Sequence, residues 1–469
     1  MKIAVEGCCH GELDMIYSHL SQLETRNGYE VDLLLICGDF QAMRNHQDLQ
    51  CMACPPKYRA LHDFYKYYTG DKIAPVLTII IGGNHEASNY MWELYHGGWV
   101  APNIYFLGHA GCVQVNGVRI AGSSGIYKDH DFGLGHYEKL PYDNRSMRSI
   151  YHTREYCIRK LSLLSSPRIF MSHDWPQSIE QHGDTNGLLR RKTFFRSDVQ
   201  NDCLGSPPLK GLLYTLKPEW WFSAHLHARF EARVDYLPPI AAPPLPPVAN
   251  PDEIVIEDDE FDVEPAAAKP EEPVTEPPRN PDEILLDDEE ETVEVAPPPS
   301  SPPLYPTTNF LALDKCLKNR HFLEVIDIPI NSDATSTVTS DPSSPHHPSL
   351  GFDPEWLAIS RAFHPWLSTT HQQRPFPPEA EARELVRKEL QWVENNVKTD
   401  EHGVIPVLQH QVFMMTAPGP GSEGAAKMQQ PPWYTNPQTE AFCRMLQIEN
   451  KINPPPPGVK PNAALAAEG

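Results

Sequence analysis

The sequence predicts an α/β fold, because short apolar runs alternate with amphipathic segments along residues 1–237. Helical spacing of apolar side chains covers 13–23, with an end expected near Gly28, and recurs over 58–68. Six apolar runs have the length and composition of buried strands, at 3–5, 33–37, 76–81, 118–121, 169–171 and 220–224. This βαβ rhythm predicts a layered sandwich, with a loop at 122–125 after the fourth run.

The charge of the chain is concentrated in one segment. The 469 residues carry a formal net charge of −23, but residues 238–306 hold 19 acidic and two basic residues. The remaining 400 residues therefore share a charge of only −6, which does not exclude a polyanionic substrate. The ten cysteines follow no disulfide framework and indicate a reducing compartment. Without a signal-peptide pattern or a long apolar run, we expect a soluble intracellular protein with no membrane partner.

The rest of the chain divides into segments of different composition. Prolines and acids crowd residues 238–306, which predicts a disordered insert. Its repeats, at 250–260 and 280–290, resemble a SUMO-interacting motif and suggest a protein partner, with a duplicated linker as the alternative. Two strand patterns over 307–330 are expected to complete the first domain. They are followed by a linker at 331–348, a helix-rich module at 349–445 and a loose tail at 446–469.

Polar side chains with metal-binding atoms follow five of the apolar runs. The carboxyl ends of parallel strands meet at one edge of a sheet, where α/β proteins place their sites. Thiolate, imidazole, carboxylate and amide oxygen are donors that hold first-row divalent metals. These residues are Cys8 and His10 after the first run, Asp39 after the second, Asn84 after the third, His173 after the fifth, and His225 and His227 after the sixth. The sequence therefore predicts a metal centre at this edge.

In this order the motifs GCCHGE, CGDF, GGNHE, MSHDW and SAHLHA resemble the calcineurin-like metallophosphoesterases. The opening GCCHGE, the later SHDWP, and TAPGP and NPQTEAFC towards the end are similar to the intron lariat RNA debranching enzymes of that superfamily. The resemblance covers residues 1–237 and the segments after Thr307. It implies a two-sheet β-sandwich flanked by helices.

The resemblance also implies two sets of ligands that share one carboxylate. One metal is expected on Cys8, His10, Asp39 and His227, and the other on Asp39, Asn84, His173 and His225. The superfamily usually has Asp first and Gly before the last histidine pair, where this chain has Cys8 and Ala224. Cysteine at the first position is familiar among debranching enzymes. Its thiolate favours Zn²⁺ or Fe²⁺ over Mg²⁺, and one or two ions of Fe²⁺, Zn²⁺ or Mn²⁺ are expected per chain.

The reaction that the resemblance implies is hydrolysis of the 2′–5′ phosphodiester at the branch point of excised lariat RNA, which linearises the intron for turnover. Two cations would hold the scissile phosphate and activate water for in-line attack. The leaving 2′-oxygen needs a proton, which we assign to His85 because imidazole titrates near neutral pH. Glu86 is expected to orient His85, with a structural hydrogen bond as the alternative.

Residues 127–160 interleave basic and aromatic side chains, a composition that suits phosphate pairing and base stacking. The motif IYHTREY in this segment resembles a lariat-recognition loop, and a solvated helix face is the alternative. A second basic cluster follows the His173 motif. The RNA contacts expected from both segments are Tyr127, Arg145, Arg148, Tyr151, His152, Arg154, Tyr156, Arg190 and Arg191.

Two other functions are compatible with the same residues. One is a different metallophosphoesterase, either a nuclease or a phosphoprotein phosphatase, and residues 127–160 argue against it. The other is a scaffold that keeps the fold and has lost catalysis, which only Cys8 favours. The lariat substrate implies action in the nucleus, with shuttling to the cytoplasm left open.

Overall fold

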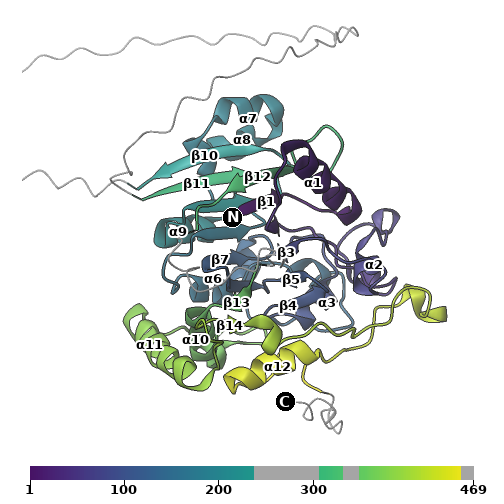
Figure 1. Cartoon of the computed structure of the whole chain (residues 1–469), viewed down its shortest axis with the longest axis vertical. Helices are drawn as coiled ribbons and strands as arrows, with labels where there is room; N and C mark the ends of the chain where they lie inside the picture. The colour runs from purple at the N-terminus through teal and green to yellow at the C-terminus, as the bar shows by residue number, and fades with distance from the viewer. Residues whose placement is uncertain (237–305, 331–347, 456–469) are drawn as a thin grey trace, which may run out of the picture. The chain divides into compact units, whose positions relative to one another are not determined.

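Two β-sheets carry the fold in the computed structural model, which describes residues 1–236, 306–330 and 348–455 (Figure 1). The first sheet has the order β12-β1-β2-β3-β5-β4. Its strands are β1 (Lys2–Glu6), β2 (Leu33–Ile36), β3 (Leu77–Ile80), β4 (Gly98–Ala101), β5 (Ile104–Phe106) and β12 (Leu323–Asp327). Strands β1, β2, β3 and β5 are parallel, whereas β12 and β4 run antiparallel to their neighbours.

The second sheet has the order β10-β11-β9-β8-β7-β6-β13-β14. Its strands are β6 (Ala110–Val115), β7 (Val118–Ser123), β8 (Ile169–Ser172), β9 (Trp220–Ser223), β10 (Phe230–Asp235), β11 (Thr307–Ala312), β13 (Leu350–Phe352) and β14 (Ile405–Pro406). Strands β7, β8, β9 and β11 are parallel. Each sheet therefore has a parallel centre whose carboxyl ends can build a shared site.

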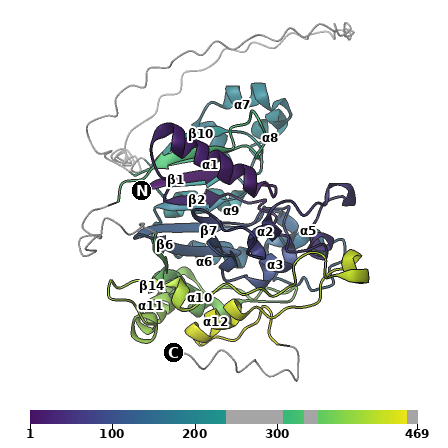
Figure 2. The same ribbon diagram turned by 45° about the vertical axis from the view of Figure 1, so that its right-hand side comes forward.

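Helices cover the outer faces of the sheets and form most of the C-terminal region (Figures 1 and 2). Those of the first 236 residues are α1 (Leu13–Asn27), α2 (Phe64–Tyr68), α3 (Ser88–Glu93), α4 (Asp129–Phe132), α5 (Ser146–Ser149), α6 (Glu155–Leu161), α7 (Thr185–Arg191), α8 (Arg196–Gln200) and α9 (Pro207–Leu216). The later ones are α10 (Pro354–Phe363), α11 (Glu379–Asn396) and α12 (Pro437–Leu446), which group together in both views. No helix in the described ranges is both long and apolar enough to cross a bilayer.

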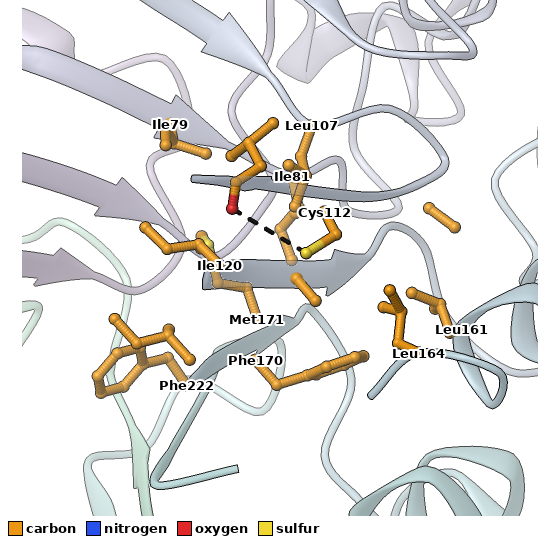
Figure 3. Close-up of a cluster of buried hydrophobic side chains, with 14 of the residues drawn as sticks. Ile79, Ile81, Leu107, Cys112, Ile120, Leu161, Leu164, Phe170, Met171 and Phe222 are labelled. Atoms are coloured by element: carbon orange, nitrogen blue, oxygen red, sulfur yellow. Dashed lines mark hydrogen bonds between the residues drawn. The ribbon is translucent and has the colours of Figure 1, made fainter. Parts of the chain in front are cut away.

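Side chains of the first sheet alternate between two cores, as the period of a strand requires. In β2, Leu33 and Leu35 join the core that contains the second sheet, whereas Leu34 and Ile36 pack with α1 and α2. Figure 3 shows part of the core between the sheets, where Ile79 gathers with side chains of β7 and β8. Each fully buried side chain of this kind contributes about 1.5–3 kcal/mol. The sandwich thus holds its strand ends in fixed positions.

The C-terminal region extends the second sheet and packs on the first domain. Strand β13 pairs with β6, and Asp353 at the start of α10 accepts a 2.7 Å hydrogen bond from Arg119 of β7. Ile452 is 1% exposed, and its carbonyl accepts a hydrogen bond from the Trp92 indole at 3.1 Å. The expectation of a loose tail from residue 446 is therefore wrong as far as Asn453, whose side chain is buried and donates to the carbonyl of Glu93.

The six apolar runs of the first domain are all strands, and the patterns at 308–313 and 321–328 are found as β11 and β12. Two local predictions were wrong. The stripe over 58–68 becomes an α-helix only at α2, because His62 has a φ of 52°, which a right-handed helix does not contain. Gly122 and Ser123, expected in a loop, pair with β6 and β8 as the end of β7.

Several predictions fall outside the described residues. The acidic insert lies there almost entirely, with its repeats at 250–260 and 280–290, and so does the linker up to residue 347. The two ends that flank the insert are described. Asp235 pairs with Thr307 across β10 and β11, and the Tyr236 N–H donates to the Pro306 carbonyl at 3.1 Å. The insert thus joins two neighbouring strand ends.

Candidate metal centre

The predicted ligands lie just beyond the carboxyl ends of parallel strands. Cys8 and His10 follow β1, Asp39 follows β2 and Asn84 follows β3 in the first sheet. In the second sheet His173 follows β8, while His225 and His227 follow β9. The two sheets therefore contribute to one centre, although Asn84 and His173, the nearest ligands in sequence from different sheets, are 89 residues apart.

Four of these residues form one cluster. The donor atoms of Cys8, His10, Asp39 and His227 all lie within 4.8 Å of one another. The Nε2 atoms of His10 and His227 are 3.3 Å apart, and His10 Nε2 is 3.7 Å from Asp39 Oδ2. One thiol, two imidazoles and one carboxylate at this spacing suit a first-row divalent metal.

The other oxygen of Asp39 faces a second group. His173 Nε2 is 3.4 Å from Asp39 Oδ1 and 3.2 Å from Asn84 Oδ1. The imidazole rings of His173 and His225 have centroids 5.0 Å apart. The structure thus brings together all seven predicted ligand positions, with the carboxylate of Asp39 between the two groups.

Neighbouring groups orient the imidazoles. His173 Nδ1 is 2.8 Å from the Cys37 carbonyl, so this nitrogen carries the hydrogen. Nε2, on the side of Asp39, is left with a lone pair that can bind a metal. The Nε2 amide of Gln41 donates to His10 Nδ1 at 3.3 Å, which fixes the orientation of the ring with its Nε2 facing the centre. The ring of His173 is therefore held in a metal-binding tautomer, whereas the contact of His10 fixes its orientation alone.

The backbone at the ligands is strained. His10, Asp39, His225 and His227 all have positive φ, between 46° and 59°, a conformation that side chains with a Cβ rarely adopt. Each such residue costs on the order of 1–3 kcal/mol and persists only where its surroundings enforce it. Four of the ligands share this strain. The backbone conformation at these residues therefore serves to place their side chains at the centre, at a cost in stability.

Two glycines allow the ligand loops to approach closely. A Cβ at Gly38 would collide with the ring of His173. A Cβ at Gly83 would lie 2.7 Å from His173 Nε2 and closer still to Asp39 Oδ1. Gly38 of the CGDF motif and Gly83, the second glycine of the GGNHE motif, are thus required by packing around Asp39.

The neutral state of the imidazoles follows from burial. Burial lowers the pKa of His173 to about 4, and burial together with His10 lowers that of His227 to about 4. Neutral imidazole is the form that binds metals. Burial opposes ionisation of Asp39, but the nearby histidines, led by His173, hold its pKa below the usual range. The carboxylate therefore stays charged at physiological pH.

The thiol of Cys8 has a different environment. Burial, followed by the charges of Asp39 and Glu6, raises its pKa, while the N–H of His225 donates to the sulfur at 3.2 Å. Coordination through this sulfur therefore releases a proton. Burial also raises the pKa of Glu6, whose two carboxylate oxygens have no hydrogen-bond partner in the described ranges. Glu6 was missed, although a charged residue inside an apolar strand was a signal.

The two catalytic candidates occupy different positions. His85 is half-buried at the centre, with its ring centroid 5.8 Å from that of His10, and its N–H donates to Asp39 Oδ1 at 2.8 Å. Its role as the proton donor stays a prediction. Glu86 is 2% exposed and accepts hydrogen bonds from the N–H groups of Phe40, Gln41 and Gly83 at 2.7–3.0 Å.

These contacts correct the assignment of Glu86 as a catalytic residue that orients His85. Within the described residues no hydrogen bond joins Glu86 to the side chain of His85, and both carboxylate oxygens are occupied by backbone donors. Glu86 instead fastens the loop after β2 to the loop after β3. It is a positioning residue for Asp39 and Asn84, which lie in those loops.

Part of the expected recognition loop lies beside the centre. Tyr151 lines a narrow cavity together with Gly83, Glu86 and Gly125. The N–H of Tyr127 donates to the carboxylate of Asp174, the neighbour of His173, at 3.3 Å. The other accessible candidates are Arg145, Arg148, Arg190 and Arg191, which are all exposed. Contact of these six residues with RNA stays a prediction.

Three candidates are buried instead. Arg154 is 0% exposed and donates to the Glu138 carboxylate and to the Asp131 carbonyl. Tyr156 is 2% exposed, with its hydroxyl on the carbonyl of Phe363. The RNA contacts predicted for Arg154 and Tyr156 are therefore wrong.

The third of these candidates, His152, is also buried, and its Nδ1 lies 2.7 Å from the Asp131 carboxylate. Acids within the same segment pair with Arg154 and His152, so these two residues belong to an internal network. This network gives the segment its shape, and RNA contact is not needed to explain these residues.

Two family models match the chain, one on each side of the acidic insert. Residues 1–229 match the family model for calcineurin-like phosphoesterases, and residues 305–451 match that for the C-terminal domain of lariat debranching enzymes. The lariat debranching enzyme of Schizosaccharomyces pombe is 40% identical over 489 residues, which cover 98% of this chain and 99% of that protein.

The chain belongs to the lariat debranching enzyme family. The Homo sapiens lariat debranching enzyme is 41% identical over 96% of this chain, which spans 69% of that protein, and the Danio rerio enzyme is 40% identical over 96% of this chain, which spans 66% of it. Membership makes the chain a metallophosphoesterase-fold hydrolase that binds divalent metal, and the four clustered donors fit such an ion.

Proposed function

We propose that this debranching-family enzyme hydrolyses the 2′–5′ phosphodiester at the branch point of excised intron lariat RNA and leaves a linear strand with a 5′-phosphate. The observation that carries the proposal is the Asp39 carboxylate, which stands between two groups of metal-binding side chains at the ends of five strands. The S. pombe lariat debranching enzyme supports the substrate class, because the chain matches 99% of that protein.

The side chains would divide the work as follows. Cys8, His10, Asp39 and His227 would hold one ion, and Asp39 would share a second with Asn84, His173 and His225. Bound divalent ions supply a Lewis acid for the phosphate oxygens and lower the pKa of a water molecule. We infer Zn²⁺ or Fe²⁺ rather than Mg²⁺, because the Cys8 thiolate is a soft ligand, and Mn²⁺ is the alternative for the oxygen and nitrogen donors.

Proton delivery to the leaving 2′-oxygen is assigned to His85. Its backbone is fixed by the hydrogen bond to Asp39, and its half-buried ring borders the centre near His10. A positioned imidazole can donate a proton to an alkoxide as it leaves. Tyr151 and Tyr127, on the neighbouring loop, are the candidates for stacking against splayed bases.

The proposal is tested with three substrates of matched concentration: a branched RNA, a linear RNA of the same sequence, and a phosphoprotein. The enzyme is loaded in turn with zinc, iron and manganese, and its metal content is measured by elemental analysis. We expect cleavage of the branched RNA alone, with a 5′-phosphate on the product. Equal or faster turnover of linear RNA or phosphoprotein contradicts the proposal, and metal content that cannot be reconstituted supports a scaffold.

A nuclear site of action follows from this substrate, because intron lariats arise where splicing occurs. The location of a fluorescently tagged full-length chain tests it. Exclusion of the tagged chain from the nucleus contradicts this part of the proposal.

A further inference from the structure

Basic side chains gather on one side of the metal centre, away from the recognition loop. They come from two segments, the end of α7 and the turn between β11 and β12. We call them the basic flank: Arg191, Lys192, Lys315 and Arg320. In both Figures 1 and 2, α7 and α8 lie beside β10, at the end of the sandwich opposite α10 and α12.

The turn after β11 is fastened to the ligand loop of β1. Lys315 forms a parallel β-bridge with Cys8, and the N–H of Cys316 donates to the Cys8 carbonyl at 3.1 Å. Gly7 permits this approach, since a Cβ there would lie 2.8 Å from the Leu313 carbonyl. Lys315 therefore follows the carboxyl end of a parallel strand, just as the metal ligands do.

The end of α7 is fastened to the ligand loop of β9. The guanidinium of Arg191 donates to the carbonyl of Arg229, two residues after His227, at 3.0 Å. Lys192 follows directly and is half-exposed. The flank is thus anchored to the loops that carry Cys8 and His227, both in the group around Asp39 Oδ2.

Positive charge in the flank exceeds what nearby acids can neutralise. Arg320 pairs with Asp314 at 3.1 Å, and Arg229, just outside the flank, is matched by Glu324 at 2.9 Å. Arg191, Lys192 and Lys315 have no carboxylate within ion-pair distance in the described part of the chain. Burial lowers the pKa of Lys192, the nearby Asp314 carboxylate opposes this, and the charges of Arg320, Lys315 and Arg191 lower the pKa further. Uncompensated repulsion of this kind lowers stability and is expected where a polyanion binds.

The flank and the recognition loop border opposite groups of the centre. Tyr151 lies beside Gly83 and Glu86, next to Asn84 and the group around Asp39 Oδ1. The flank adjoins Cys8 and His227, in the group around Asp39 Oδ2. A branched RNA has three arms that diverge from one nucleotide, so a second surface is needed for an arm that leaves the loop.

We propose that the basic flank binds the phosphates of one RNA arm as it leaves the metal centre on the side of His10 and His227. This inference rests on the proposed function and adds a surface outside the recognition loop. The contact is electrostatic and independent of base sequence, because lysine and arginine on phosphate position a strand without reading it. Its contribution requires an arm long enough to reach Lys192 and Lys315.

The test compares two branched RNAs, one with arms of about ten nucleotides, a length within single-strand binding sites, and one trimmed to single nucleotides. The main variant is Lys192→Gln with Lys315→Gln. For the long-armed RNA we expect KM to rise roughly three- to tenfold, as for two lost exposed ion pairs. The dependence of log KM on log salt should flatten by about 1.4, or about 0.7 for each contact to a single strand. The effect on the trimmed RNA should be several times smaller.

Two further variants make the result decisive. Lys192→Arg with Lys315→Arg keeps the charge and should restore the KM for the long-armed RNA. Arg233→Gln removes an exposed cation of β10 that already pairs with Asp235 at 3.0 Å, and should leave KM and the salt slope unchanged. An equal rise of KM for both RNAs, or no change of the salt slope, overturns the inference. Failure of the wild-type chain to cleave either branched RNA counts against the proposed function instead.

Discussion

Replacing Gly83 by alanine isolates the packing requirement at the centre. The new Cβ would lie 2.7 Å from His173 Nε2 and nearer to Asp39 Oδ1, whereas real Cβ atoms essentially never come within 3.0 Å of another group. The backbone hydrogen bonds from Phe40 and Gln41 to Glu86 hold the two loops together and prevent an easy separation. The same Cβ would collide with the backbone nitrogen of Asp39, so the ligand loop itself must shift along with the side chains of Asp39 and His173.

The cost can be estimated from these contacts. Overpacking of this kind costs about 1–3 kcal/mol of stability, and a displacement of about 1 Å in a reacting group lowers the rate roughly 10²-fold. We expect Gly83→Ala to fold, to bind less metal and to lose about two orders of magnitude in kcat/KM. The assays are chemical denaturation, elemental analysis and cleavage of branched RNA.

The neighbouring glycine is a matched control. A Cβ at Gly82 would have its nearest contacts at 3.6 Å and 3.7 Å, to Ser124 and Glu86, which is ordinary van der Waals distance. Gly82→Ala should therefore keep its metal and most of its activity. If Gly83→Ala cleaves as fast as the wild type, or if Gly82→Ala loses as much, the reasoning about close approach to Asp39 is refuted.

Three other changes test separate parts of the structure. His85→Ala should still bind branched RNA but cleave it roughly 10²–10⁴-fold more slowly in single-turnover assays, as expected for a lost general acid; an unchanged rate removes His85 from that role. Arg154→Gln should lower the free energy of unfolding by about 3–5 kcal/mol, since it leaves the buried Glu138 carboxylate unpaired; a loss of RNA affinity at full stability would restore Arg154 as a contact. Replacing residues 238–305 by a short glycine linker should leave cleavage in vitro within twofold, because Tyr236 and Pro306 are already hydrogen-bonded neighbours; loss of cleavage by the folded deletion variant would assign the insert a role in the reaction.

The strands and the ligands could be predicted because both depend on local pattern. A buried parallel strand is an apolar run of a few residues, and a donor such as Asp39 stands out at its end. The predicted helix over 58–68 was wrong for a local reason as well, since the positive φ of His62 cannot be seen in the apolar spacing.

Burial of charged residues could not be predicted in the same way. Arg154 and Arg148 belong to the same basic stretch, but only Arg154 meets Glu138 in the interior. Lys315 was not predicted as a site residue, because it is brought to Cys8 by β11, a strand that begins only after the acidic insert. Which cation is paired and which is free depends on tertiary neighbours, and a single sequence does not contain that information directly.

The position of β11 has a consequence for how the chain is made. This strand lies between β9 and β10 and is bonded to both, yet it is encoded after the insert. A nascent chain that ends before residue 306 therefore lacks an interior strand of its second sheet, and β10 lacks the one strand that it pairs with in the described sheets. Assembly of the sandwich has to wait until the ribosome has passed the insert. Once the sandwich has formed, cleavage within the insert by a protease should leave the two fragments associated, because β11 remains hydrogen-bonded to β9 and β10.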